Sequence, residues 1–101
     1  MTGKLPDHWH RQAADYFQSY REGRYDSFAY LTHIYPEDEI RPSDDGESLA
    51  IGRPGADGLE FSLRRNMPGV WVWYPLDNVW RQVADDIAAL ERDWVSGALK
   101  V

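Results

Sequence analysis

The spacing of apolar and polar residues predicts a helix near the start of this chain. Apolar side chains recur at helical intervals across residues 8–22, and polar residues occupy the positions between them. Asp7 stands where a helix N-cap is expected, and Gly23 stands where a glycine commonly ends a helix. We therefore expect an N-terminal helix over residues 8–22, with an apolar stripe made of Trp9, Ala13, Tyr16, Phe17 and Tyr20.

The middle of the chain has the shorter alternation that is typical of strands. The stretch "YDSFAYLTHIYP" at residues 25–36 fits either a strand or a second short helix, and "EDEI" at residues 37–40 fits one turn of helix followed by a loop. The apolar runs "SLAIG", "LEFSLRR" and "VWVWYPL" come next and predict an antiparallel meander over residues 48–84. Turn-forming pairs separate these runs, namely Pro54-Gly55, Asp57-Gly58 and Pro68-Gly69.

The run "VWVWYPL" is the strongest strand signal in the sequence. Alternation places Val70, Val72 and Tyr74 on one face of this strand. Trp71 and Trp73 then lie on the other face. Large apolar groups on both faces indicate either a central strand covered on both sides or a strand that uses one face for binding.

The C-terminal segment admits two interpretations. One is a long helix capped by Asp77 or Asn78, and the helical period alone slightly favours it. The other is a strand over residues 79–84, a cap at Asp85 and a helix over residues 86–96 that ends at Gly97. The helical stripe of the first interpretation consists of Trp80, Val83, Ala84, Ile87, Leu90 and Trp94.

Length and composition indicate one small folded domain. The chain has 101 residues, of which 43% are hydrophobic, and this suits a single core over residues 1–101. We expect an α+β fold with an N-terminal helix, an antiparallel sheet of about four strands and a C-terminal helix packed on the sheet. The sequence does not indicate the oligomeric state.

Charge and hydropathy narrow the expected partners. The net charge of −6 argues against a nucleic-acid partner, because binding to nucleic acid depends on neutralising phosphates with Lys and Arg. An acidic surface favours a basic protein partner, or serves solubility alone. No stretch approaches the roughly 20 apolar residues that span a membrane, and the first residues lack the apolar core of a signal peptide. We therefore expect no membrane partner and a cytoplasmic location.

The candidate motifs do not point to catalysis, a metal or a cofactor. The glycines of "IGRPGADGLEF" lack the Lys and Ser or Thr of a P-loop and precede a strand, so this loop is expected only to turn the chain. There is no cysteine, and His8 and His10 are two residues apart, which is not the spacing of a helical metal pair. The acidic stretch "SDDGES" does not match the calcium-loop order. A cleft that brought His33 or His10 within hydrogen-bond reach of a buried carboxylate would instead suggest an enzyme.

Two features could together form a protein-binding surface. One is an acidic tract, and the other is the tryptophan pair of the aromatic strand. Aromatic anchors supply affinity and charges steer encounter, although such tracts are often just solvated surface and such strands are often core. The candidate partner-binding residues are Glu37, Asp38, Glu39, Asp44, Asp45, Glu47, Trp71 and Trp73.

Residues 48–101 resemble the SUKH superfamily, the Smi/Knr-like domains found in bacterial toxin-immunity proteins. The resemblance rests on a strand ending in Gly, a turn, the aromatic "GVWVWYP" strand, a strand ending in Ala-Asp, and a helix that closes with Trp and Gly. The N-terminal half departs from the pattern, and "LPDHW" at residues 5–9 is only a partial echo of the family's start. The resemblance implies a strand over 79–84 followed by a helix over 86–96, a sheet packed by helices, and no enzymatic activity.

The function that follows is binding. We expect a non-catalytic protein-binding module, and the resemblance implies an immunity protein that neutralises a toxin, such as a nuclease, by occluding it. The alternative is a small-ligand-binding or regulatory domain that uses residues 70–75 as a pocket wall.

Overall fold

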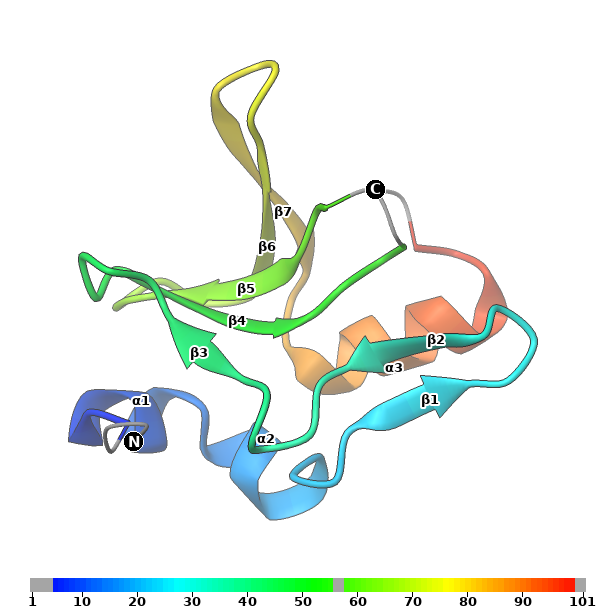
Figure 1. The fold of residues 1–101 in the computed structure, drawn as a ribbon, viewed down its shortest axis with the longest axis horizontal. Helices are drawn as coiled ribbons and strands as arrows, with labels where there is room; N and C mark the ends of the chain where they lie inside the picture. Colours follow the sequence, from blue (N-terminus) through cyan, green and yellow to red (C-terminus); the bar gives the residue numbers. More distant parts are fainter. Residues whose placement is uncertain (1–4, 56–57, 100–101) are drawn as a thin grey trace.

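Three helices and an antiparallel sheet of seven strands, counted within the described residues, form an α+β fold (Figure 1). It is described by a computed structural model that covers residues 5–55 and 58–99. In chain order the elements are α1 (Asp7–Gln12), α2 (Ala14–Ser19), β1 (Arg24–Asp26), β2 (Leu31–Ile34), β3 (Arg41–Pro42), β4 (Ser48–Gly52), β5 (Phe61–Arg64), β6 (Val70–Tyr74), β7 (Val79–Ala84) and α3 (Ile87–Ser96).

The sheet has more strands than the sequence predicts. Its order is β1-β2-β4-β5-β6-β7, and β3 pairs with β4 beside this path. The expectation of about four strands is wrong because β1, β2 and β3 have two to four residues each, too few for alternation to reveal. β2 and most of β1 lie within residues 25–36, the stretch that fits either a strand or a second short helix by sequence. Residues 37–39 form a turn closed by the Glu39 backbone N–H, which donates to the Pro36 carbonyl at 2.9 Å.

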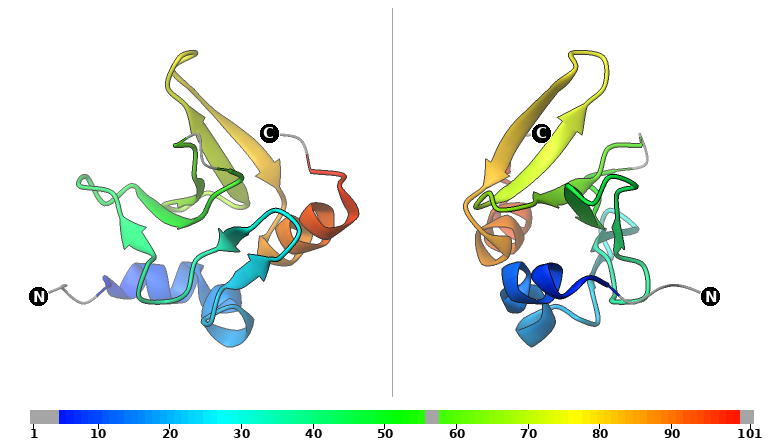
Figure 2. Two further views of the ribbon diagram at one scale, coloured as in Figure 1. Left: turned by 45° about the vertical axis from the view of Figure 1, so that its right-hand side comes forward. Right: turned by 90° about the vertical axis from the view of Figure 1, so that its left-hand side faces the viewer.

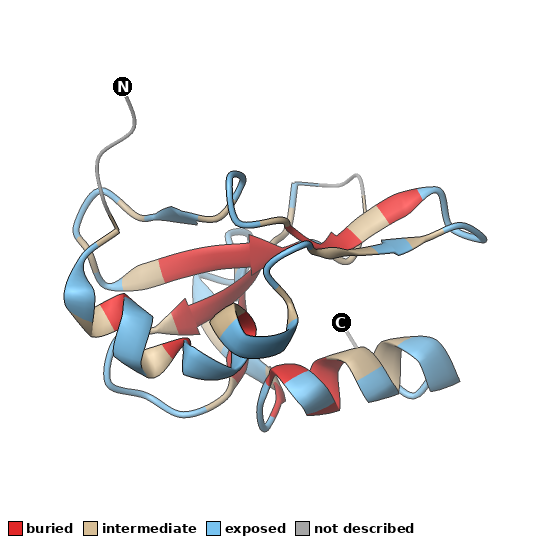
Figure 3. Ribbon diagram, turned by 90° about the horizontal axis from the view of Figure 1, so that it is seen from below, coloured by how far each residue is buried: buried red, intermediate tan, exposed pale blue. Residues whose placement is uncertain are grey.

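All three helices lie on one side of the sheet (Figure 2). Alternation along β4, β5 and β6 turns every second side chain toward these helices, and those side chains are buried (Figure 3). The helices contribute their own buried residues, chiefly Trp9, Tyr16 and Leu90. The Tyr16 hydroxyl donates to the Tyr35 carbonyl at 2.6 Å, so its buried polar atom is satisfied. The strand residues of this core include Ile34, Leu49, Ile51, Phe61, Leu63, Val70 and Val72.

The N-terminal helix is interrupted. Where the apolar spacing predicts one helix over residues 8–22, α1 and α2 are separate and Ala13 lies between them with non-helical angles (φ −98°, ψ 28°). The Gln12 side chain, at the break, binds the turn between β5 and β6: it donates to the Arg64 carbonyl at 2.6 Å and accepts from the Asn66 N–H at 3.0 Å. Tertiary contacts therefore override the helical period here. Pro6 rather than Asp7 is the N-cap of α1.

The C-terminal segment is a strand followed by a helix, as the resemblance implies and contrary to the slight preference of periodicity. β7 pairs with β6 along its length except at an irregularity beside Val83, and this register places Trp80 opposite Trp73. The helix cap is Asp86 and not Asp85, since the Asp86 carboxylate accepts the Ala89 backbone N–H at 2.7 Å. Gly97 ends α3 in the left-handed conformation (φ 79°) that glycine adopts without strain.

Replacing Asp86 by alanine should lower the free energy of unfolding by about 1 kcal/mol, because the first turn of α3 loses its cap. Asp85→Ala is the matched control. Its exposed carboxylate makes no hydrogen bond or ion pair with the described residues, so we expect a change within about 0.5 kcal/mol. Urea denaturation followed by circular dichroism measures both. Equal losses in the two variants would contradict the assigned cap.

Candidate functional site

The face of the sheet that the helices leave uncovered carries a groove of about 670 Å³. Its floor comes from the alternate positions of the strands: Ser62 and Arg64 on β5 point away from the core that Phe61 and Leu63 enter. The β3–β4 hairpin contributes to one side and the β6–β7 hairpin to the other. Besides Ser62 and Arg64, the lining includes Arg41, Asp45, Glu47, Ser48, Ala50, Glu60, Trp73 and Trp80.

Two tryptophans form the aromatic wall of this groove. Trp73 and Trp80 are directly opposed across β6 and β7, and their ring centroids are 5.5 Å apart. Trp73 is 37% exposed, so its indole is available to a ligand. Trp71 lies on the same face of β6, where its indole N–H donates to the Pro68 carbonyl at 3.0 Å. The tryptophans of the aromatic strand therefore belong to the open face, while Val70 and Val72 belong to the core.

Arg64 connects the tryptophans. Its guanidinium carbon lies 5.0 Å from the ring centroid of Trp71 and 4.8 Å from that of Trp80. Both distances are within the range of cation–π attraction. The side chain is thus held in place across β5, β6 and β7.

Paired charges occupy the rest of the groove. Arg41 is 2.7 Å from Glu60, and Arg65 is 3.6 Å from Glu47. Glu60 also accepts the Tyr35 hydroxyl at 2.7 Å. Burial, and after it this hydrogen bond, raises the pKa of Tyr35 to about 12. Tyr35 therefore remains a neutral donor at physiological pH.

A second, smaller groove of about 530 Å³ continues from the first. The two share Arg41 and Glu60, and the second is also lined by Thr32, Tyr35 and Arg53. The ion pair of Arg41 and Glu60 therefore stands where the grooves meet. The two grooves thus adjoin, and together they form a larger open surface than either one alone.

The structure separates the acidic tract into two groups. Asp45 and Glu47 line the main groove together with Trp73, and the exposed Asp44 lies in the same β3–β4 turn. Hydrogen bonds from the Ser43 hydroxyl and then the Glu47 backbone N–H lower the pKa of Asp45, which keeps it charged.

The other acidic residues lie apart from the main groove. Glu37 forms an ion pair with Arg21 at 2.8 Å. Asp38 is exposed in the turn at residues 37–39, and Glu39 lines the second groove and not the main one.

Arg64 and Trp80 are the groove residues that the sequence does not single out. A helical period over residues 79–84 places Trp80 in an apolar helical stripe. Once β7 is a strand, alternation brings Trp80 beside Trp73. Alternation along "FSLR" could have identified Arg64, because it places Arg64 on the other face of the strand from Phe61 and Leu63.

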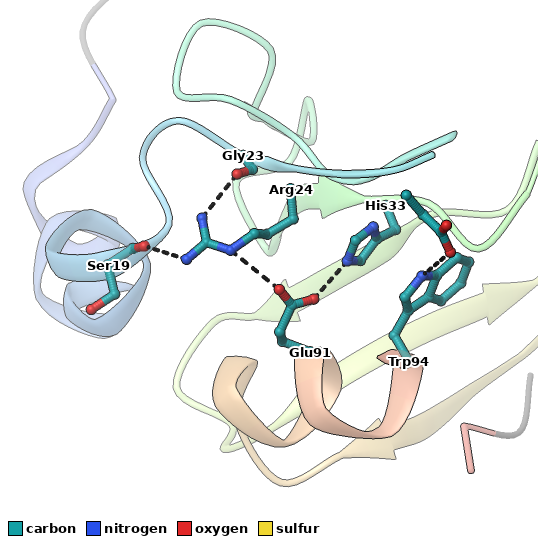
Figure 4. Close-up of polar contacts among 7 residues, drawn as sticks. Ser19, Gly23, Arg24, His33, Glu91 and Trp94 are labelled. Atoms are coloured by element: carbon teal, nitrogen blue, oxygen red, sulfur yellow. Dashed lines mark hydrogen bonds and ion pairs between the residues drawn. The ribbon is translucent and has the colours of Figure 1, made fainter. Parts of the chain in front are cut away.

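A partly buried polar network lies on the side of the sheet that α3 covers (Figure 4). His33 Nε2 is 2.6 Å from Glu91 Oε1, and the other oxygen of Glu91 is 3.2 Å from Arg24 Nε. The ring of Trp94 stacks on His33 with centroids 4.8 Å apart, and its indole N–H donates to Asp26 at 2.8 Å. The network joins β1 and β2 to α3.

The pairing of His33 with a carboxylate is the arrangement that would suggest an enzyme. His33 is only 3% exposed, however, and Trp94 stacks on its ring. A substrate would have to displace the helix α3 to reach the imidazole. We therefore interpret the pair as a structural link between the hairpin and the helix.

The described residues offer neither a metal-binding cluster nor a membrane-spanning helix. Within residues 5–55 and 58–99, no group of three or more His, Asp or Glu side chains is arranged to hold a metal ion. In that same part of the chain, no helix has the length and apolar character needed to cross a bilayer.

Comparison with known proteins gives no relative: no family model, no curated protein and no solved structure matches the chain.

Proposed function

We propose that this chain is a non-catalytic protein-binding module and that the groove on the open face of the sheet is its binding surface. The observation that carries the proposal is a concave surface with the half-exposed Trp73 and its neighbour Trp80 as one wall. Binding energy at protein interfaces is concentrated in such aromatic anchors and in arginine. Arg64, held against Trp80, supplies the second kind of anchor.

We further propose that the partner is a basic toxin domain, such as a nuclease, that the chain neutralises by occlusion in the cytoplasm. The net charge of −6 would accelerate the approach of a basic protein. Asp45 and Glu47 at the groove would then meet its cations. The resemblance of residues 48–101 to toxin-immunity domains supports the same role.

Calorimetric titration with the toxin domain encoded beside the gene for this chain tests the proposal. Trp73→Ala should weaken binding by about 30-fold, the loss typical of a hot-spot tryptophan. Val95→Ala is the control, since Val95 is exposed on α3, away from the groove, and should bind as the unaltered protein does. The groove proposal is wrong if both variants bind equally well, and the toxin proposal is wrong if the unaltered protein does not bind at low salt.

A small-ligand or regulatory role is the second candidate. The volume of about 670 Å³ falls within the range of small-molecule sites, and tryptophans form part of the wall. A saturable change in tryptophan fluorescence on adding one member of a metabolite panel, abolished by Trp73→Ala, would favour this role over protein binding.

A further inference from the structure

Arg64 differs from the other arginines of the groove because no carboxylate of the described residues is paired with its guanidinium. Arg41 and Arg65 are each paired with a carboxylate, Glu60 and Glu47 respectively. The guanidinium of Arg64 has no hydrogen bond and no ion pair with any described residue; it lies only over the faces of two indoles. Its side chain is partly buried, so these N–H groups are incompletely exposed to water.

The backbone of Arg64 and one of the two indoles beside its guanidinium are fixed by hydrogen bonds. The backbone carbonyl of Arg64 accepts the Gln12 side chain at 2.6 Å, and Ser48 pairs with Arg64 across β4 and β5. Trp71, one of the two indoles, is anchored by its own hydrogen bond to Pro68. A planar fork of donors that is already positioned loses little further freedom when it binds an acceptor.

We propose that Arg64 is the receptor for a carboxylate of the partner, an Asp or Glu side chain in an extended segment that lies in the groove. The inference rests on the proposed binding function. A carboxylate matches the fork of the guanidinium with two parallel hydrogen bonds, and the pair would be sheltered by Trp71 and Trp80.

The carboxylates that line the groove beside Arg64 indicate which charges the rest of the partner's segment carries. Asp45, Glu47 and Glu60 line the same groove, so a chain of phosphates would be repelled there. A segment with a single carboxylate and nearby Lys or Arg residues could pair its carboxylate with Arg64 and its cations with the carboxylates of the groove. The segment we infer is therefore an acidic residue within a basic stretch, which agrees with a basic partner.

Selection of short random peptides displayed on phage tests the inference. Peptides selected on the unaltered protein should be enriched in Asp or Glu beside basic residues. A selected peptide should bind Arg64→Gln at least about tenfold more weakly, while Arg92→Gln, an exposed arginine of α3, is the matched control and should bind it unchanged.

A double-mutant cycle separates an anchor from a structural role. Changing the selected acidic residue of the peptide to its amide should weaken binding to the unaltered protein and have no further effect on Arg64→Gln. The Arg64 Nε–H resonance should also shift on binding the acid form and not the amide form. If Arg64→Gln does not fold, the acid-to-amide comparison and this resonance, both on the unaltered protein, still decide the question.

Two outcomes would overturn the inference and differ in what they say of the proposed function. Peptides that shift the Trp73 and Trp80 indole resonances but show no preference for acids would remove the anchor and leave the groove as a binding surface. Selected peptides that shift neither indole would remove both.

Discussion

Replacing Phe61 by alanine should lower the free energy of unfolding by about 3–5 kcal/mol. Phe61 is fully buried on the inner side of β5, between Gly52 of β4 and Val72 of β6. Its ring meets Trp94 of α3 edge to face, with centroids 6.3 Å apart. Its removal leaves a cavity between the sheet and the C-terminal helix, and strands paired on both sides can close that cavity only in part.

The matched control for Phe61→Ala is Phe28→Ala. Phe28 is 97% exposed in the turn after β1, so the same chemical change should alter the free energy of unfolding by less than about 0.5 kcal/mol. Chemical denaturation of both variants gives the comparison. A domain of this size has a total stability of about 5–15 kcal/mol, so Phe61→Ala should also be partly unfolded well below the midpoint temperature of the unaltered protein. A loss under 1 kcal/mol would contradict the packing described for the core.

Gly52→Ala should destabilise the protein by about 3 kcal/mol or more. A Cβ atom at this position would overlap the backbone carbonyl oxygen of His33, and it would lie 3.0 Å from the carbonyl carbon. Backbone atoms cannot swing aside as a long side chain can. β2 and β4 meet here, at the pairing of Ile34 with Gly52. Overpacking commonly costs about 1–3 kcal/mol, and the hydrogen bonds at this junction would be lost in addition, each worth about 1 kcal/mol.

Those hydrogen bonds provide a local measurement. The Tyr35 N–H donates to the Ile51 carbonyl at 2.7 Å, and the Arg53 N–H donates to the His33 carbonyl at 3.2 Å. Amide exchange at Tyr35 and Arg53 should accelerate in Gly52→Ala. Gly46→Ala is the comparison, since Gly46 has a left-handed backbone (φ 74°) but open space around it, and it should cost only about 1–2 kcal/mol. A smaller loss in Gly52→Ala than in Gly46→Ala would contradict the close approach of the two strands.

The sequence predicts the α+β class and the division of the aromatic strand into two faces, because alternation over five residues determines which side chains share a face. It leaves open which of the two faces is outward. The pattern of "VWVWY" separates Val70 and Val72 from Trp71 and Trp73, and the burial of the valines agrees. The same method fails for the shortest strands. β3 has two residues, Arg41 and Pro42, which are too few to show an alternating pattern. Its pairing with β4 in the folded chain identifies it as a strand.

The candidate site could be predicted only where its residues are near one another in the sequence. Asp45 and Glu47 were identifiable as a charged turn, and Trp73 as part of a strand. Their meeting with Arg64 and Trp80 depends on the register of β6 against β7, which the helical stripe of residues 80–94 obscures. The link between His33 and Glu91 spans 58 positions along the chain, and neither residue has a local pattern that indicates the other.

The place of β7 at the end of the strand order has a consequence for self-association. A terminal strand of six residues offers a row of backbone donors and acceptors to any other chain, which is a common start of aggregation. Arg81 occupies the middle of that row, with its guanidinium 5.8 Å from the centre of the Tyr74 ring. Two copies that paired edge to edge about this position would bring like charges together. A charged side chain in the middle of a terminal strand is one of the features that disfavour such edge-to-edge pairing, and Arg81 supplies it here.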